Sequence, residues 1–528
     1  MPTRRPIRRP FKSLLAILAL TTVCILFSPA DSRAKENAQK DAELDPRQRN
    51  TWFAAGRETV GEASQFIKDE RPAKNVILFV GDGMGVSTVT AARILEGQQR
   101  GGSGEENHLA FESLPHVAFS KTYSTDSQVS DSAATMTAIV SGVKTQLAVL
   151  GVDQRVQRGD YASVEAASVL TILEEAEDRG LATGIVSTAK VTHATPAGCY
   201  SHVPLRGWEN DSKLTAPARR AGFPDIARQL IEFSHGDGLE IALGGGRTHF
   251  TPKGTPDPEN PKIFGRRLDG RDLTQEWVDA RDGSSYVWNR DQLLAIDPET
   301  TRHLLGLFEP EHMKFETDRA DDTAGEPSLA EMTAFAIGAL SRDPDGFFLM
   351  VEGGRIDHGH HLGNAYRALT ETIALSDAVR VALEKTDAKD TLIVVTADHS
   401  HTLTISGYPM RGNPILGKVV GRSRKKEGTN EIAVDAKGKP YTTLSYANGP
   451  GYVDARRRPD LSKVDTEDPE YLQEVTVPMR SETHAGEDVP IFAGGPRSAL
   501  FHGVREQNYI YHAMVEALGW TRAGVPVD

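Results

Sequence analysis

Four short segments, far apart in the chain, concentrate carboxylates and histidines. They are residues 80–83, 352–361, 396–401 and 483–488. Apolar runs that are typical of buried strands lead into the first three segments and follow the fourth, at 75–80, 347–351, 392–396 and 489–493. Because the strands of an open α/β sheet carry functional residues at one edge, we expect the four segments to meet there. Carboxylates and imidazoles are metal ligands, so the pattern indicates the metal site of an enzyme.

Asp357 and His361 are four residues apart and share one face if their segment is helical. A carboxylate and an imidazole at this spacing suit Zn²⁺, and His484 would complete three protein ligands with an open fourth position. His358 and His360 lie in the same run, where we expect them to support the ligands or to face solvent. A single carboxylate–histidine pair also occurs on protein surfaces without binding a metal, but several such pairs at strand ends favour a metal cluster.

Asp82 lies in the glycine-rich turn 81–85, directly after a strand. Such a turn could cradle a pyrophosphate, but the spacing of its glycines is not the dinucleotide fingerprint, and a carboxylate at its tightest point repels anions. The glycines instead favour the close approach of Asp82 to cations. A capping aspartate is the alternative for this residue.

Asp398 and His399 form a second carboxylate–imidazole pair at a strand end. Glu352 closes a buried apolar strand, and a charged residue in that position needs a partner. Together with Asp82 and Thr195 it makes an oxygen-only set. Oxygen ligands suit a hard ion such as Mg²⁺.

Asp131 and Ser132 begin an apparent helix over 132–138. A helix N-terminus favours anions, so Ser132 could hold an oxyanion or a phosphate, whereas the simple alternative is an N-cap serine. The chain has no Gly-x-Ser-x-Gly elbow, so a nucleophilic Ser132 needs a metal to lower the pKa of its hydroxyl. Arg206 could hold two phosphate oxygens in a planar fork, although alone it would be taken for a surface arginine.

These segments resemble those of the alkaline phosphatases, and the similarity runs from about residue 50 to residue 515. Residues 306–310, 353–355 and 483–488 resemble the animal-type branch more than the enteric bacterial one. The resemblance implies hydrolysis of phosphate monoesters to alcohol and inorganic phosphate, through a phosphoserine intermediate, at alkaline pH and with a broad substrate range. It also implies that Ser132 is the phosphorylated nucleophile and that Arg206 holds the phosphate.

The same resemblance implies two Zn²⁺ ions and one Mg²⁺ ion. One zinc would be held by Asp357, His361 and His484, and the other, beside Ser132, by Asp82, Asp398 and His399. The magnesium would be held by Asp82, Thr195 and Glu352. His193 stands where some branches carry Asp, and would lie near both the magnesium, through water, and the substrate. A calcium site in the animal-type branch matches Glu259, the backbone oxygen of Phe308, Glu309 and Glu326.

Strands and helices alternate from residue 75 onward, which predicts an α/β three-layer sandwich with a central, mostly parallel sheet flanked by helices. We expect strands at 75–80, 183–187, 239–243, 346–352 and 391–397. We expect helices at 86–98, 131–141, 163–179, 224–233, 328–342 and 363–385. Within the domain 35–528, residues 247–327 are expected to form an elaborated lobe and residues 404–482 a small inserted cap subdomain over the site.

Residues 1–34 have the features of an export signal: basic residues, then an apolar stretch too short for a comfortable membrane span, then small residues. We therefore expect a periplasmic or extracellular protein. Arg8 and Arg9 resemble a twin-arginine signal, which would direct export of the folded protein. A single N-terminal membrane anchor is the alternative interpretation of this segment. Without the six basic residues and one acidic residue of this segment, 54 Lys and Arg face 72 Asp and Glu, a net charge near −18. That charge argues against nucleic acid as a partner.

Two rival functions fit parts of the pattern. A phosphodiesterase or sulfatase would share the superfamily, but a sulfatase needs a Cys-x-Pro-x-Arg-like nucleophile segment, which Ser132 does not begin. An exported protein that binds metal or phosphate without turnover belongs to another class, and Ser132 beside Asp131 argues against it. The basic run 422–426 is expected to be a solvated loop, and Cys199 a buried, inert thiol. The protein could form a homodimer, and its natural phosphate ester is not identified by the sequence.

Overall fold

The computed structural model describes residues 69–423, 428–454 and 456–520. The expected export signal, 1–34, lies outside the described residues, as do residues 35–68 and residues 424–426 of the basic run. No helix in the part of the chain that is described combines the length and apolarity needed to cross a membrane.

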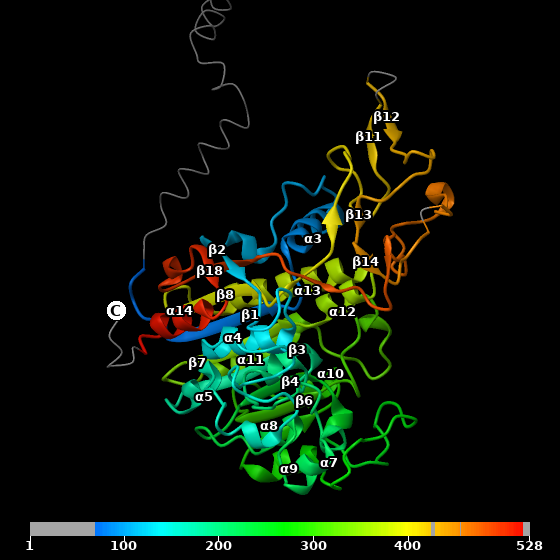
Figure 1. Cartoon of the computed structure of the whole chain (residues 1–528). Helices are drawn as coiled ribbons and strands as arrows, with labels where there is room; N and C mark the ends of the chain where they lie inside the picture. The colour runs from blue at the N-terminus through cyan, green and yellow to red at the C-terminus, as the bar shows by residue number, and fades with distance from the viewer. Residues whose placement is uncertain (1–68, 424–427, 455, 521–528) are drawn as a thin grey trace, which may run out of the picture. The chain divides into compact units, whose positions relative to one another are not determined.

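A sheet of ten strands runs through the described domain (Figure 1). Its order is β18-β2-β17-β8-β1-β7-β3-β4-β6-β5. The strands are β1 (Asn75–Gly81), β2 (His116–Lys121), β3 (Ala182–Lys190), β4 (Ile241–Gly245), β5 (Ser284–Val287), β6 (His303–Leu307), β7 (Phe347–Gly353), β8 (Thr391–Ala397), β17 (Val489–Gly494) and β18 (Gly503–Glu506). Only β17 runs antiparallel to its neighbours in this sheet. The predicted mostly parallel α/β sheet is therefore confirmed.

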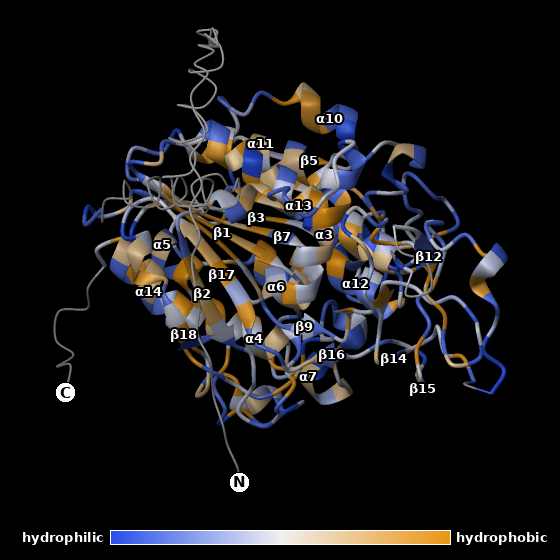
Figure 2. Cartoon of the chain, turned by 90° about the horizontal axis from the view of Figure 1, so that it is seen from above, coloured by the Kyte–Doolittle hydropathy of each residue, from blue (hydrophilic) through white to orange (hydrophobic). Residues whose placement is uncertain are grey.

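Helices cover both faces of the sheet because its central strands are apolar on both sides (Figure 2). In β1, Ile77 and Phe79 point to one face, and Val76, Leu78 and Val80 to the other. The first face carries α3 (Val86–Gln99), α11 (Leu329–Leu340) and α13 (Ala365–Lys385). The second carries α4 (Ser132–Ser141), α5 (Ile172–Glu177), α8 (Ile226–Ile231), α9 (Leu273–Ala280) and α14 (Tyr509–Ala517). The helices and the sheet therefore form three layers, as predicted from the sequence.

The predicted helix 163–179 is wrong in extent, since only Ile172–Glu177 is α-helical. Thr171 caps this helix and forms a capping box with Glu174, which fixes the start at residue 172. Ser168, just before it, instead bridges to Val152. Sequence reasoning also missed β2 and β18. Within the expected lobe 247–327, β5 and β6 extend the main sheet, so part of that stretch belongs to the sheet itself.

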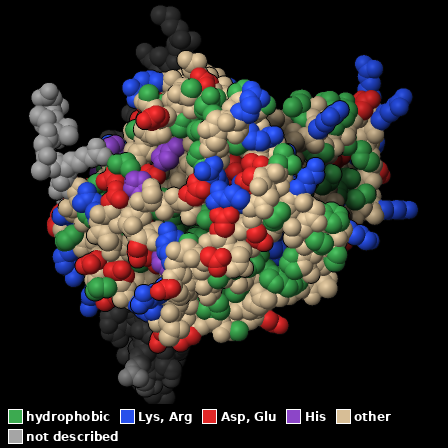
Figure 3. Space-filling view, turned by 90° about the horizontal axis from the view of Figure 1, so that it is seen from below, with side chains coloured by type: hydrophobic (Ala, Val, Ile, Leu, Met, Phe, Trp, Pro, Cys, Tyr) green, Lys and Arg blue, Asp and Glu red, His purple; other side chains and the backbone are tan. Residues whose placement is uncertain are grey.

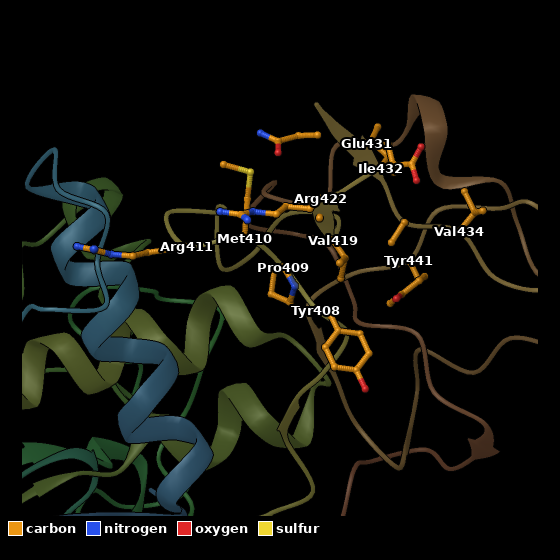
Figure 4. Close-up of a pocket in the computed structure, with 13 residues that line it drawn as sticks. Tyr408, Pro409, Met410, Arg411, Val419, Arg422, Glu431, Ile432, Val434 and Tyr441 are labelled. Carbon is orange, nitrogen blue, oxygen red and sulfur yellow. The ribbon is translucent and has the colours of Figure 1, made fainter. Parts of the chain in front are cut away.

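Residues 404–482 contain short strand pairs outside the main sheet. These strands are β10 (Thr404–Ile405), β11 (Val420–Arg422), β12 (Asn430–Ile432), β13 (Leu444–Ser445), β14 (Asn448–Gly449) and β15 (Val477–Pro478). A cavity of about 1190 Å³ lies among them, lined by residues such as Tyr408, Met410 and Tyr441 (Figure 4). None of the predicted site residues lines this cavity.

Two carboxyl groups beside β3 and β4 make the stability of the fold depend on pH. The backbone N–H of Thr183 donates to Glu240 Oε2 (2.6 Å), and that of Gly238 to Glu177 Oε2 (3.2 Å). Burial and the nearby charge of Glu177 raise the pKa of Glu240 to about 9. Burial also raises the pKa of Glu177, to about 7. In the unfolded chain both groups ionise near pH 4.5, so the folded state loses stability as pH rises from there to about 9.

Glu240→Gln should therefore raise the melting temperature by a few degrees at pH 9.5 and by much less at pH 5. The amide oxygen of Gln can still accept from the Thr183 N–H, but the amide does not ionise, so the cost of a buried negative charge at high pH disappears. Calorimetry of both proteins at the two pH values measures the difference. Equal shifts at pH 5 and pH 9.5 would contradict the assignment.

Candidate metal centre

Three carboxylates meet where three neighbouring strands end. Asp82 follows β1, Asp398 follows β8, and Glu352 lies on β7 opposite Val80 of β1. Since β1 lies between β7 and β8, these side chains share one edge of the sheet, and all three are fully buried. Gly83 allows the turn after β1, with φ of +71° and a position where a Cβ would lie 2.4 Å from the His401 ring.

Ser132 is brought to this edge by the first turn of α4. Asp131 is the N-cap of the helix and accepts from the Ala134 N–H, so the N-cap alternative for Ser132 is wrong. The Ser132 Oγ lies 3.2 Å from His399 Nε2 and donates to Asp82 Oδ1 at 3.5 Å. The serine hydroxyl therefore lies among predicted metal ligands, at a helix N-terminus that favours anions.

One predicted ligand set is assembled around Asp357. The Oδ1 of Asp357 lies 3.3 Å from His361 Nε2 and 3.4 Å from His484 Nε2, and these two nitrogens are 3.3 Å apart. His361 Nδ1 donates to the Glu482 carbonyl (2.6 Å) and His484 Nδ1 to the Ser130 carbonyl (2.8 Å). Because a carbonyl can only accept, each neutral imidazole keeps a lone pair on Nε2. That is the nitrogen a metal ion needs.

His401 also belongs to this group, and sequence reasoning missed it. Its Nε2 lies 2.7 Å from Asp357 Oδ1, and its Nδ1 contacts the carboxylate of Glu482. Burial opposes the charged form, but the two carboxylates raise the pKa of His401 to about 9. With both nitrogens donating, His401 orients Asp357 rather than offering a lone pair. The only sign in the sequence was that His401 alternates with His399 after β8, a pattern too short to predict which side chains meet.

The second predicted set, Asp82, Asp398 and His399, is also brought together. His399 Nε2 lies 3.4 Å from both Asp82 Oδ1 and Asp398 Oδ2. Burial raises the pKa of Asp82 well above its usual range, and the charges of Asp398, Asp357 and Glu352 add to that shift. Asp82 Oδ2 and Asp398 Oδ2 are buried without a hydrogen-bond partner. Buried carboxylates in mutual repulsion with unused oxygens fit a divalent cation.

The set with only oxygen ligands, Asp82, Glu352 and Thr195, shares Asp82 with the second zinc set. Burial raises the pKa of Glu352 to about 7, partly offset by the hydroxyls of Ser187 and Thr195. Thr195, on α6 (Ala194–Ala197), is fully buried. Asp82 and Glu352 also group with His193, which the sequence had placed as a neighbour of the magnesium. These oxygens fit the donor preference of Mg²⁺.

Arg206 lies beside these residues, and two side chains hold its guanidinium in place. Its Nη1 donates to Asp131 Oδ2 and its Nη2 to His193 Nε2, both at 3.1 Å. Asp131 also accepts from the N–H of Ala148, in the loop after α4, and the Ala148 carbonyl accepts from the Arg206 N–H at 2.8 Å. The guanidinium is therefore next to Ser132 through their shared neighbour Asp131. Histidine, acidic and basic side chains reach the surface together on the face seen in Figure 3.

The expected calcium residues are brought together only in part. Glu259 and Glu309 group with Asp322, whereas Glu326 is outside this set. The Oε1 of Glu326 accepts from the Lys314 N–H at 2.8 Å, and its Oε2 is buried without a hydrogen-bond partner. The Lys314 ammonium lies 2.9 Å from Glu309 Oε1, so a positive charge already faces the group.

Comparison with known proteins gives the family. The family model of alkaline phosphatase matches residues 73–520. The tissue-nonspecific alkaline phosphatase of Gallus gallus is 46% identical over 485 residues, 90% of each chain. The alkaline phosphatase of Gadus morhua is 45% identical, covering 90% of this chain and 98% of its own. The chain therefore belongs to the alkaline phosphatase family and is a phosphate monoester hydrolase, and these animal relatives agree with the branch that the sequence resembles.

Solved structures agree in fold. The alkaline phosphatase of Thermus thermophilus superimposes with a TM-score of 0.61 at 24% identity, covering 88% of this chain and 95% of that one. That of the Antarctic bacterium TAB5 gives 0.59 at 24% identity, with 86% and 100% covered. At this identity the likeness concerns the fold alone.

Proposed function

We propose that Ser132 is the nucleophile of a two-step hydrolysis in which the phosphoryl group passes through phosphoserine to water. The observation that carries this proposal is the position of its Oγ, at the first turn of α4, within 3.2 Å of His399 Nε2 and beside Arg206. In the first step Oγ forms a bond to phosphorus as the ester P–O bond breaks. In the second, water attacks phosphorus and the P–Oγ bond breaks, releasing inorganic phosphate.

The donor sets support two zinc ions and one magnesium ion. Asp357, His361 and His484 would hold one zinc, and Asp82, Asp398 and His399 the other, while Asp82, Glu352 and Thr195 would hold magnesium. When bound, such ions lower the pKa of a hydroxyl and neutralise charge that develops on phosphoryl and leaving-group oxygens. The residues fit because the buried carboxylates have unused oxygens, and His361 and His484 keep free lone pairs.

The protein's own groups bind and orient the phosphate. Arg206 would hold two non-bridging oxygens through its planar fork, and Asp131 keeps that fork in place. The N–H groups of the first turn of α4 point toward the same region and favour an anion. Ser132 must give up its proton before attack, so activity should rise toward alkaline pH.

Calcium, export and assembly are further proposals. Glu259, the backbone oxygen of Phe308, Glu309 and Glu326 would hold calcium, with Asp322 beside Glu259 and Glu309, if the Lys314 ammonium moves away. The features of residues 1–34 support export to the periplasm or the cell exterior. A homodimer is proposed from the family alone, and sedimentation of the purified protein would test it.

A comparison of two substrates on one metal-analysed sample tests the proposed function. We expect rapid turnover of p-nitrophenyl phosphate, slow turnover of bis-p-nitrophenyl phosphate, and about two zinc and one magnesium per chain. Preference for the bis ester would favour a phosphodiesterase. A single stoichiometric release of phosphate would favour a binding protein.

Glu482 should matter for the metal although it is no ligand, because its carboxylate contacts His401 and its carbonyl fixes His361. Glu482→Gln should weaken zinc binding by about 10- to 100-fold, since the charge that holds His401 against Asp357 is lost. Competition with a chromophoric chelator measures the affinity. Glu470→Gln, at an exposed ion pair with Arg367, is the control, and an equal loss there would contradict the role of Glu482.

A further inference from the structure

A second group of histidines lies beside the metal ligands, and two of its three members, His312 and His358, have no part in the mechanism above. His193 precedes α6, His312 lies in the segment after β6, and His358 is on α12 (Arg355–His361). The ring centroids of His312 and His358 are 4.2 Å apart, and those of His193 and His312 are 5.1 Å apart. All three rings are half-buried. We call these three residues the histidine cluster.

Each ring of the histidine cluster faces a hydrogen-bond donor with one nitrogen. Arg206 Nη2 lies 3.1 Å from His193 Nε2, and Arg355 Nη1 lies 3.2 Å from His358 Nδ1. The backbone N–H of Lys190 donates to His312 Nδ1 at 3.3 Å. Guanidinium and amide N–H groups can only donate, so the nitrogen that faces them carries the lone pair. The other nitrogen of each ring then carries the hydrogen.

This arrangement is the reverse of the one at the zinc ligands. His361 and His484 donate to carbonyls and keep lone pairs, whereas the histidine cluster accepts from donors and keeps N–H groups. A zinc ion on the three rings would require three donors to lose their acceptors. The histidine cluster therefore offers three hydrogen-bond donors: Nδ1 of His193, Nε2 of His312 and Nε2 of His358. The first of these is buried without a partner.

The charge next to the histidine cluster also favours an anion. Arg355 stacks on the Phe315 ring, with its guanidinium carbon 3.8 Å from the ring centroid. Among the described residues no carboxylate lies within ion-pair distance of Arg355, although the charges of Glu371 and Glu326 act on it from farther away, and its Nε is buried without a partner. A half-buried cation that no carboxylate contacts directly, beside N–H donors, suits an oxyanion.

We propose that the histidine cluster and Arg355 bind a second anionic group of the substrate, either a phosphoryl group or a carboxylate. This inference rests on the proposed function, because Arg206 would hold the reacting phosphate. The two positions are neighbours, since the Nη2 of Arg206 contacts His193 of the cluster. The preferred esters would then be phosphate monoesters whose leaving group carries another anion a few bonds away.

The test compares propyl phosphate with the bisphosphates of ethane-1,2-diol, propane-1,3-diol and butane-1,4-diol. His312 is the residue to change, because it is in none of the proposed zinc, magnesium and calcium sets. His312→Ala should lower the ratio of kcat/KM for the best bisphosphate to that for propyl phosphate by about tenfold, as expected for the loss of a hydrogen bond to a charged group. His312→Gln, which keeps an N–H donor, should restore part of the ratio. His502→Ala, at an exposed and remote histidine, should leave it unchanged.

A second measurement separates this proposal from the proposed function. Calorimetry of the metal-loaded Ser132→Ala protein should show about tenfold weaker binding of the bisphosphate, and unchanged binding of propyl phosphate, when His312→Ala is added. This result is needed whether or not Ser132 is the nucleophile. An unchanged ratio and unchanged bisphosphate binding would overturn the proposal. So would the loss of one zinc per chain in His312→Ala, which would make the histidine cluster a metal site.

Discussion

Ser132→Ala should abolish formation of a phosphoenzyme and lower kcat by roughly 10³-fold or more, because no other hydroxyl lies at the first turn of α4 within reach of His399 and Asp82. Arg206 and the buried ligands would still bind phosphate, so KM should change far less than kcat. Acid quench after mixing with ³²P-labelled substrate measures the phosphoenzyme, and steady-state kinetics measures kcat.

Ser141→Ala is the matched control for this experiment. Ser141 is a buried serine at the other end of the same helix, and its hydroxyl donates to the Thr137 carbonyl. The control variant should keep the label and the turnover. Near-normal kcat for Ser132→Ala, at unchanged metal content, would refute the nucleophile. Loss of metal together with activity would instead show that Ser132 only supports the ligands.

The parallel strands of the site were predictable from the sequence. The apolar runs that precede Asp82, Glu352 and Asp398 pair in register, so that Val80 lies opposite both Glu352 and Thr396. This geometry follows from the parallel sheet alone, which places the residues after neighbouring strands at one edge. The same logic applies to Asp357 and His361, which one turn of α12 places on the same side.

Contacts that depend on irregular segments were not predictable. His401 reaches Asp357 because β9 (Ser400–His401) pairs with β16 (His484–Ala485), and two residues give no periodicity to detect. His312 and Asp322 lie in a segment without long elements, where spacing does not determine which side chains meet. Residue types also do not reveal that Glu326 Oε1 accepts from the Lys314 N–H, which leaves its buried Oε2 without a hydrogen-bond partner.

Removal of the metals should cost both activity and stability. Asp82, Glu352, Asp357 and Asp398 are buried in one small volume, and the charges of three of them already oppose the ionisation of Asp82. Without cations, Asp82, Glu352 and Asp398, whose pKa values are raised by burial, must take up protons or repel one another, whereas hydrogen bonds from His401 and His484 outweigh burial and lower the pKa of Asp357. Dialysis against a chelator should abolish turnover and lower the melting temperature by roughly 10 °C, and zinc plus magnesium should restore both.

The stability measurement has a control that does not depend on catalysis. Ser132→Ala keeps all four carboxylates, so chelation should lower its melting temperature as much as that of the wild type. Because the apo site must bind protons to relieve repulsion, the loss of stability on chelation should grow as pH rises from 6 to 9. A chelated protein that loses activity but keeps its melting temperature across this range would show that the carboxylates do not depend on bound cations. The electrostatic argument for the metal centre would then fail.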